Sequence, residues 1–171
     1  MSDIPRAIEV NGKRFSVLKL LGKGKGGYSY LVTDGTRQYV LKQIHHEPCS
    51  YYTFGNKIEA ELNDYKKLSD MGIALPRLID CDVKNERILK EFIDGDVLSD
   101  LIERNELRDD HVEQIRAMCR KLYAAGLNID YYPTNFVAVD GVVYYIDYEC
   151  NEYSDEWNFE NWGERYYKKQ L

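Results

Sequence analysis

Residues 126–136 read GLNIDYYPTNF, and residues 145–149, a few positions further on, read YIDYE. Between them these stretches hold Asp130, Asn135 and Asp147, each at a point where a loop meets an apolar, strand-like run. Two carboxylates and a carboxamide can hold a divalent metal and a hydroxyl nucleophile. The spacing is also typical of plain turns, because Asp and Asn side chains bond their own backbone and Pro interrupts regular structure. The rest of the chain has to decide between a site and a turn.

The length and charge of the chain restrict the class of protein. Its 171 residues suffice for one domain, or for two lobes that share a cleft. The 29 acidic and 23 basic residues give a formal charge of −6, which argues against nucleic acid as the main partner. No apolar run reaches membrane-spanning length and residues 1–14 have no apolar signal core, so we expect a cytoplasmic protein with no membrane partner. The widely spaced cysteines are expected to be reduced, half-buried thiols: Cys49, Cys81, Cys119 and Cys150.

Residues 15–32 predict a strand, a glycine turn and a second strand, with GKGKGG at 22–27 forming the turn. No helix follows these glycines, although a dinucleotide-binding fold would need one. The Walker pattern also fails, because Tyr28 follows the glycines where Lys is required. What remains is a hairpin whose backbone N–H groups can close over phosphates. The glycines concerned are Gly22, Gly24 and Gly27.

The next strand, predicted over residues 38–43, carries Lys42 near its end. Burying a Lys in an apolar strand is costly unless an anion meets it. One possible partner is a phosphate under the glycine hairpin, and the other is Glu61 on a helix predicted over residues 56–71. A Glu on a helix is usually solvated. Because Glu61 lies on the apolar side of this helix, we favour an ion pair with Lys42.

Three of these segments resemble conserved motifs of the protein-kinase-like superfamily: LGKGKGGY at 21–28, VLK at 40–42 and ELNDYKKL at 61–68. They are similar to its glycine loop, its strand Lys and the Glu of its C-helix. The resemblance implies that Lys42 orients the α- and β-phosphates of ATP and that Glu61 holds Lys42.

Residues 76–80 and 87–93 predict two further strands, the second of which resembles the strand that leads to the kinase hinge. The resemblance implies that Glu91 and Ile93 contact the adenine. Lys90 would then guard the adenine pocket, where a Lys is unusual.

On the same resemblance, Asp130 takes the position of the catalytic base, and Asn135 and Asp147 hold Mg²⁺. Phosphoryl transfer through a loose transition state needs positioning and charge neutralisation more than covalent help. Magnesium prefers oxygen ligands, keeps several waters and takes only a few protein groups.

The chain also departs from the superfamily pattern. Asn128 and Ile129 stand where His-Arg usually precedes the base, which suggests that no phosphorylated activation loop switches the protein. Tyr132 replaces a Lys that neutralises the γ-phosphate in many protein kinases, so transfer is expected to be slow. The Asp-Tyr-Glu at 147–149 resembles the aminoglycoside- and choline-kinase branch.

The C-terminal half predicts helices over residues 98–105 and 110–125, with His111 on the surface. The aromatic residues of 157–167 predict a single helix that packs beneath the catalytic loop. About two dozen residues follow Asp147, so we expect a truncated lobe without a peptide-docking platform. Residues 147–164 hold seven carboxylates and no Lys or Arg. A solvated acidic face explains such a run best, and attraction of a cationic substrate is the second interpretation.

These expectations define an α+β, protein-kinase-like two-lobed fold. An antiparallel sheet with one helix forms the N-terminal lobe (residues 1–93), and a truncated, mainly helical C-terminal lobe follows (residues 94–171). The predicted function is ATP- and Mg²⁺-dependent transfer of the γ-phosphate to a hydroxyl of a small molecule or of a protein, the acceptor being unknown. The alternative is a pseudokinase, or a nucleotide-binding partner subunit similar to the small kinase-like ATPase of the tRNA threonylcarbamoyl-adenosine complex. In that case a protein partner is expected at the short C-terminal lobe.

Overall fold

The structure is a computed structural model that describes residues 4–24, 26–46 and 56–168. It divides into two compact units. Unit 1 comprises Met1–Ala60 and Pro76–Phe92, and unit 2 comprises Glu61–Leu75 and Ile93–Leu171. None of the helices within the described residues is both long and apolar enough to cross a membrane.

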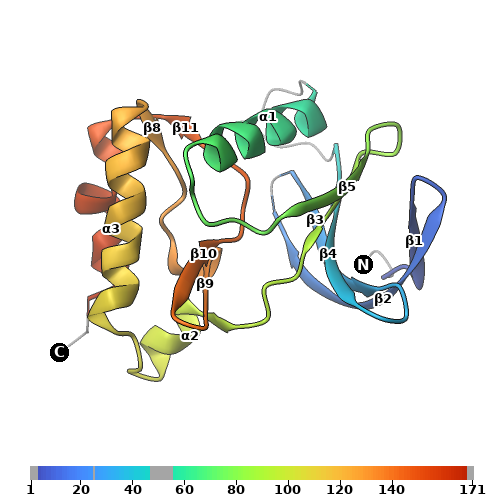
Figure 1. Cartoon of the computed structure of the whole chain (residues 1–171), viewed down its shortest axis with the longest axis horizontal. Coiled ribbons are helices and arrows are strands. Elements are labelled where there is room, and N and C mark those ends of the chain that lie inside the picture. The colour runs from blue at the N-terminus through green and yellow to red at the C-terminus, as the bar shows by residue number, and fades with distance from the viewer. Residues whose placement is uncertain (1–3, 25, 47–55, 169–171) are drawn as a thin grey trace. The chain divides into compact units, whose positions relative to one another are not determined.

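Unit 1 is built on a six-stranded antiparallel sheet in the order β1-β2-β3-β4-β6-β5 (Figure 1). The strands are β1 Ala7–Val10, β2 Lys13–Lys23, β3 Gly27–Thr33, β4 Gln38–Ile44, β5 Leu78–Asp82 and β6 Arg87–Glu91. A short apolar core lies on one face of the sheet; its members include Val10, Phe15, Val32, Leu41 and Leu89. Because β-branched and aromatic residues suit a pleated, half-buried surface, these runs form strands as the sequence predicts.

The strand β1 was not predicted from the sequence. It is four residues long, too short for a clear alternation, and it joins β2 through a tight turn in which Asn11 and Gly12 have φ of 49° and 83°. The Asn11 backbone N–H donates to Asp82 Oδ2 at 3.0 Å, so this turn is tied to the end of β5.

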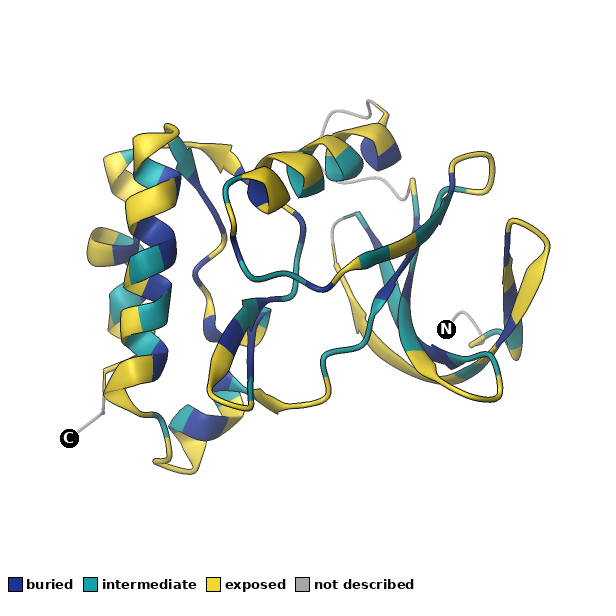
Figure 2. Ribbon diagram, in the orientation of Figure 1, coloured by how far each residue is buried: buried dark blue, intermediate teal, exposed yellow. Residues whose placement is uncertain are grey.

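Unit 2 contains most of the helical residues. Its elements are most of α1 (Lys57–Asp70), then β7 Asp96–Val97, α2 Leu98–Glu103, α3 Asp109–Ala124, β8 Leu127–Asn128, β9 Phe136–Val139, β10 Val142–Tyr145 and β11 Asn151–Glu152. Short helical turns are η1 Pro133–Asn135, η2 Asp155–Trp157, η3 Phe159–Gly163 and η4 Glu164–Tyr166. Along one side of α3 the positions are buried and along the other they are exposed, as its apolar spacing predicts (Figure 2). The core of unit 2 includes Ile115, Leu122, Tyr131, Phe136 and Tyr145.

The α+β class and the antiparallel N-terminal sheet with few helices are confirmed, and they agree with a truncated kinase-like fold. The prediction of one aromatic helix over residues 157–167 is wrong. Asn158 has an extended backbone (φ −73°, ψ 170°) and its side chain accepts a hydrogen bond from the Asn161 N–H, so the chain breaks there into separate turns.

Two expectations about single side chains are also corrected. His111 is buried, with 7% of its surface exposed, because its Nδ1 accepts a hydrogen bond from the Arg108 N–H at the start of α3. Cys119 and Cys150 are buried rather than half-buried, whereas Cys81 is half-buried as predicted and Cys49 lies outside the described residues.

Candidate active site

The loop that carries Asp130 is closed by its own hydrogen bonds. It runs from the end of β8 to η1, where Pro133 starts a turn with a pre-set backbone angle. The Asp130 side chain is exposed, and its Oδ1 accepts a hydrogen bond from the Tyr132 N–H at 3.1 Å. Asn135 Nδ2 donates to the Asp130 carbonyl at 3.3 Å. This second bond and the bond from the Asn135 N–H to the Tyr132 carbonyl at 3.0 Å hold Asn135 next to Asp130.

The β9–β10 hairpin brings Asp147 to this loop. The strands pair in register with Phe136 opposite Tyr145, and the next backbone bond runs from Ile146 N–H to the Asn135 carbonyl at 2.9 Å. Asp147 follows directly and is half-buried, with its Oδ1 accepting from the Tyr148 N–H at 2.7 Å. Unit 2 therefore brings together three of the predicted site residues: Asp130, Asn135 and Asp147.

A buried hydroxyl joins the two segments. Tyr145 Oη accepts from the Asp130 N–H at 3.4 Å and donates to the Glu149 carbonyl at 2.8 Å. Burial, with a further contribution from the negative charge of Asp147, raises the pKa of Tyr145 well above its ordinary value. The phenol therefore stays protonated and keeps its donor.

Residues that sequence reasoning did not identify as supports lie beneath the loop. Asn128 is 3% exposed; its Nδ2 donates to the Ser154 carbonyl at 3.1 Å, and its Oδ1 accepts from the Tyr131 hydroxyl at 3.2 Å. Tyr167 donates its hydroxyl to the Tyr131 carbonyl at 2.7 Å. A polar Asn128 within an apolar run is the sequence signal that indicates such a buried support. The expectation that the tail packs against the catalytic loop is thus confirmed, although the tail is not one helix.

In unit 1, Lys42 lies against the glycine hairpin. Lys42 is opposite Ser29 on β3, and a Cβ on Gly27 would stand 3.1 Å from Lys42 Cε and 2.7 Å from the Gln43 carbonyl oxygen. The hairpin closes through Gly24 N–H and the Gly27 carbonyl at 2.9 Å. At Gly22, by contrast, a Cβ would meet no atom within 4 Å, so the backbone there is open to a ligand.

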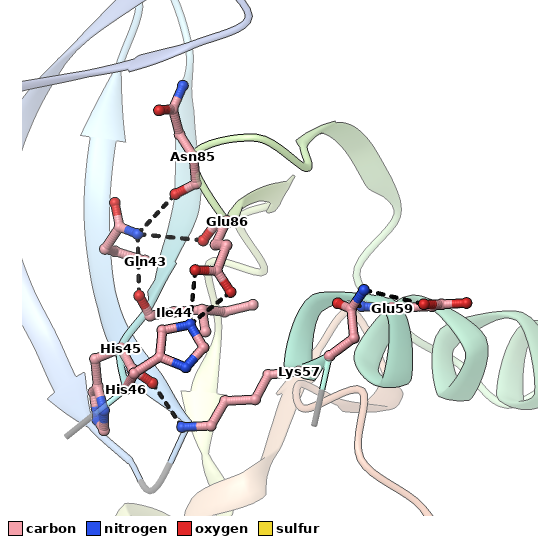
Figure 3. Close-up of polar contacts among 9 residues, drawn as sticks. Gln43, Ile44, His45, His46, Lys57, Glu59, Asn85 and Glu86 are labelled. Carbon is pink, nitrogen blue, oxygen red and sulfur yellow. Dashed lines mark hydrogen bonds and ion pairs between the residues drawn. The ribbon is translucent and has the colours of Figure 1, made fainter. Parts of the chain in front are cut away.

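The turn of the hairpin contacts His45, which follows β4, and Figure 3 shows the polar contacts around His45 and His46. His45 Nε2 lies 2.9 Å from the Gly24 carbonyl, and the His45 N–H donates to the Gly26 carbonyl at 3.1 Å. Lys57, buried at the start of α1, donates to the His45 carbonyl at 2.6 Å. His46 Nε2 contacts both carboxylate oxygens of Glu86. His45 therefore contacts the turn of the hairpin, and Lys57 holds the His45 backbone.

The remaining predicted residues lie in different units. Glu91 ends β6, where its N–H donates to the Arg77 carbonyl at 2.9 Å and its Oε1 accepts from the Arg77 N–H at 3.1 Å. Ile93 begins the second segment of unit 2. Glu61 is half-buried on the part of α1 that belongs to unit 2, whereas Lys42 belongs to unit 1, so their ion pair stays a prediction.

Comparison with known proteins gives two curated relatives and no matching family model. The chain is 29% identical to "KEOPS complex subunit Bud32" of Pyrococcus abyssi over 94 residues, 53% of this chain and 42% of the relative. It is 30% identical to a "Probable bifunctional tRNA threonylcarbamoyladenosine biosynthesis protein" of Methanococcus vannielii over 89 residues, 52% of this chain and 16% of the relative. The alignments therefore span less than half of either relative.

These similarities confirm the kinase-like resemblance. The compact kinase-like ATPase named from the motifs is the type of protein that the chain matches. Phosphoryl transfer by this chain is a separate question, because one fold hosts many activities.

The oxygen donors of unit 2 fit a magnesium ion of the kinase-like type. The side chains of Asn135 and Asp147 can bind a metal ion only through their oxygen atoms. The Asn135 amide is oriented by the hydrogen bond that its Nδ2 donates to the Asp130 carbonyl. Among the described residues no group of three or more His, Cys, Asp or Glu forms a metal site by itself. Magnesium typically binds through one or two carboxylates together with waters and substrate phosphates, so this sparse donor set suits it.

Proposed function

We propose that the protein is an ATP- and Mg²⁺-dependent phosphotransferase of the kinase-like type that acts on a hydroxyl group in the cytoplasm. The observation that carries the proposal is the joined segment of unit 2, in which Asp130, Asn135 and Asp147 are fixed by the Asn135–Ile146 backbone bond and the Tyr145 hydroxyl. The similarity to two kinase-like relatives supports nucleotide binding.

In this proposal each residue has a physical task. Asp130, exposed to solvent and fixed at its backbone, accepts the proton of the attacking hydroxyl. Asn135 and Asp147 hold the metal, which neutralises phosphate charge when bound. Gly22, Gly24 and Gly27 let the backbone approach the phosphates, and Lys42, extended along the hairpin, meets their charge, with Glu61 as its ion-pair partner. Glu91 and Ile93 present backbone groups to the adenine.

A second candidate is a kinase-like ATPase that serves as a nucleotide-binding partner subunit. Two observations favour it: the chain matches a protein named as a subunit of a complex, and Tyr132 brings no positive charge next to Asp130. A protein partner at the C-terminal unit would then be required for function.

Two measurements separate these candidates. Thermal melting with ATP and Mg²⁺ should show stabilisation, because a ligand that binds only the native state raises apparent stability. Transfer of the γ-phosphate should then be followed against amino sugars, amines, generic proteins and the protein itself. Transfer to an acceptor supports the phosphotransferase, whereas release of inorganic phosphate alone supports the ATPase subunit. No thermal shift at millimolar ATP would refute both.

A further inference from the structure

Four aromatic side chains of unit 2 form a continuous series, which we name the aromatic ladder: Trp157, Trp162, Tyr166 and Tyr132. In this order, the centroids of successive rings lie 5.8, 5.4 and 5.0 Å apart, and the interplanar angles are 61°, 63° and 71°. The Tyr132 N–H donates to Asp130 Oδ1 at 3.1 Å, so the last ring of the ladder adjoins the proposed base.

Three rings of the ladder are exposed, and the fourth, Trp162, is half-buried and packs against the core of unit 2. Trp157, Tyr132 and Tyr166 are 52%, 42% and 37% exposed, whereas Phe159 and Tyr167 of the same tail are 0% and 6% exposed. Single exposed apolar residues are normal, but three exposed rings that are joined by contacts among themselves and with the half-buried Trp162 favour an interaction surface. Phe159 and Tyr167 therefore pack the tail into the core of unit 2, whereas the exposed rings of the ladder are available for contact with another molecule.

The charges around the ladder are predominantly negative. Asp155 and Glu156 share the turn η2 with Trp157, Glu160 lies on η3 with Trp162, and all three are exposed. The positively charged residues of the same tail are Arg165, which donates to the Asn161 carbonyl at 2.6 Å, and Lys168. Arg116 of α3 pairs with Glu164. Aromatic faces beside carboxylates favour Lys and Arg side chains, since the ring quadrupole attracts cations and guanidinium groups stack on rings. Nucleic acid bases also stack on rings, but these carboxylates would repel the phosphates.

We infer that the aromatic ladder docks an Arg- and Lys-bearing peptide segment of a protein partner. A peptide suits the ladder better than a single amine, because an extended chain places same-side residues about 7 Å apart. The exposed rings of Trp157 and Tyr166 lie on either side of Trp162, at 5.8 and 5.4 Å from it, so more than one side chain of such a peptide can reach an exposed ring. Binding needs no nucleotide, and a peptide held along the ladder leads to Asp130.

The test is fluorescence anisotropy of the full chain, without nucleotide, against three labelled probes: an Arg-Ser repeat peptide, a Glu-Ser repeat peptide and a single-stranded DNA oligonucleotide. The Arg-Ser peptide should bind tightest and weaken with salt. Trp157→Ala should weaken its binding about five- to tenfold, since a cation–π contact supplies an effect of that order. Tyr166→Ala should act in the same direction, and Glu156→Gln should weaken binding about twofold. Val142→Ala, on a similarly exposed residue (38%) of the β9–β10 hairpin, should leave binding unchanged.

Equal binding of the acidic peptide, tighter binding of the oligonucleotide, or unchanged peptide affinity in both Trp157→Ala and Tyr166→Ala would each overturn the inference. Circular dichroism melting should match wild type in both variants, and whichever variant melts normally carries the result. ATP-induced thermal stabilisation, measured in parallel, should persist in Trp157→Ala. If the wild-type chain shows the ATP-induced thermal shift but does not bind the peptide, this inference fails and the proposed function stands. If it binds the peptide but shows no thermal shift with ATP, the proposed function fails and this inference stands.

Discussion

Residues 128–149 of unit 2 and the glycine hairpin at residues 22–28 of unit 1 carry most of the predicted site, and they are built differently. In the first, the rings of Tyr131, Phe136 and Tyr145 are completely buried, and bonds between distant residues fix the loop. On the strand that leads into the second, Leu20 and Leu21 are 39% and 44% exposed, and the pairing of β2 with β3 is interrupted by two register shifts.

This difference indicates that residues 128–149 are preorganised and that the glycine hairpin is not. Groups that must stabilise developing charge are effective when their positions are fixed before the ligand arrives, and buried hydrogen bonds supply that rigidity. A hairpin that covers phosphates gains from open backbone, and β-bulges with exposed strand residues allow it to adjust. Substitutions in the first segment should therefore affect turnover and stability, and substitutions in the second should affect nucleotide affinity.

The largest effect is expected from Asp130→Asn. The Asn keeps a side-chain oxygen for the Tyr132 N–H but removes the base, so ATP turnover should fall by at least about 100-fold while nucleotide binding is retained. Asp140→Asn is the matched control, because Asp140 is exposed at the β9–β10 turn with φ of 51°, a conformation that Asn tolerates. Turnover that survives in Asp130→Asn would show that the base is assigned wrongly.

Gly163→Ala should next reduce stability. A Cβ at Gly163 would stand 2.6 Å from Tyr131 Cβ and 3.0 Å from Phe159 Cδ2, so the free energy of unfolding should fall by about 1–3 kcal/mol. Gly22→Ala, where the Cβ meets open space, should keep stability and weaken ATP binding. Urea denaturation and ATP titration measure the two effects. If Gly22→Ala lost as much stability as Gly163→Ala, the two regions would not differ in rigidity as we infer.

Tyr145→Phe tests the bridge between the two segments of unit 2. Losing the hydroxyl leaves the Asp130 N–H and the Glu149 carbonyl without this partner, which should cost about 1–2 kcal/mol of stability and also reduce ATP turnover. Tyr123→Phe is the control, because the Tyr123 hydroxyl also bridges two groups, Glu160 Oε2 at 2.7 Å and the Phe159 N–H at 2.9 Å. We expect both variants to lose a similar amount of stability and only Tyr145→Phe to lose ATP turnover. Equal turnover defects in both variants would argue that the bridge is merely structural.

The smallest effect near neutral pH concerns ionisation in unit 2. Burial, followed by the nearby charge of Asp64, raises the pKa of the Cys150 thiol from 9.0 to about 12. Burial likewise raises the pKa of four tyrosines: Tyr123, Tyr131, Tyr145 and Tyr167. The unfolded chain therefore loses these protons at lower pH than the folded chain. The stabilisation is complete below pH 9, and it is lost as pH rises from 9 through the raised folded-state values.

Thermal melting over an alkaline series, with tyrosinate absorbance as a second readout, measures this loss. Cys150→Ala should lessen the loss of stability between about pH 9 and pH 10 without abolishing it, because burial also raises the pKa of the Cys119 thiol. Tyrosinate absorbance that rises well before unfolding would contradict the prediction.

Local sequence patterns predicted the longer strands of unit 1 and the three α-helices within about two residues at most of their ends. The strand expected over 28–32 is Gly27–Thr33, and the helix expected over 110–125 is Asp109–Ala124. The predictions that failed depend on distant partners: β1 needs its pairing with β2, and His111 is buried although its position in the first turn of α3 suggested a surface residue.

The order of the motifs, the kinase-like resemblance and the candidate residues Lys42, Asp130 and Asp147 can be read from the amino-acid sequence, because residue type and short spacing are local information. How the candidates of unit 2 are held depends on the packing of the folded chain. The Tyr145 bridge, the Tyr167 bond to Tyr131 and the close approach of Gly163 join residues far apart in the chain. A periodic pattern tells which face of an element is buried, but the packing of the whole unit selects the hydroxyl or the ring that meets it.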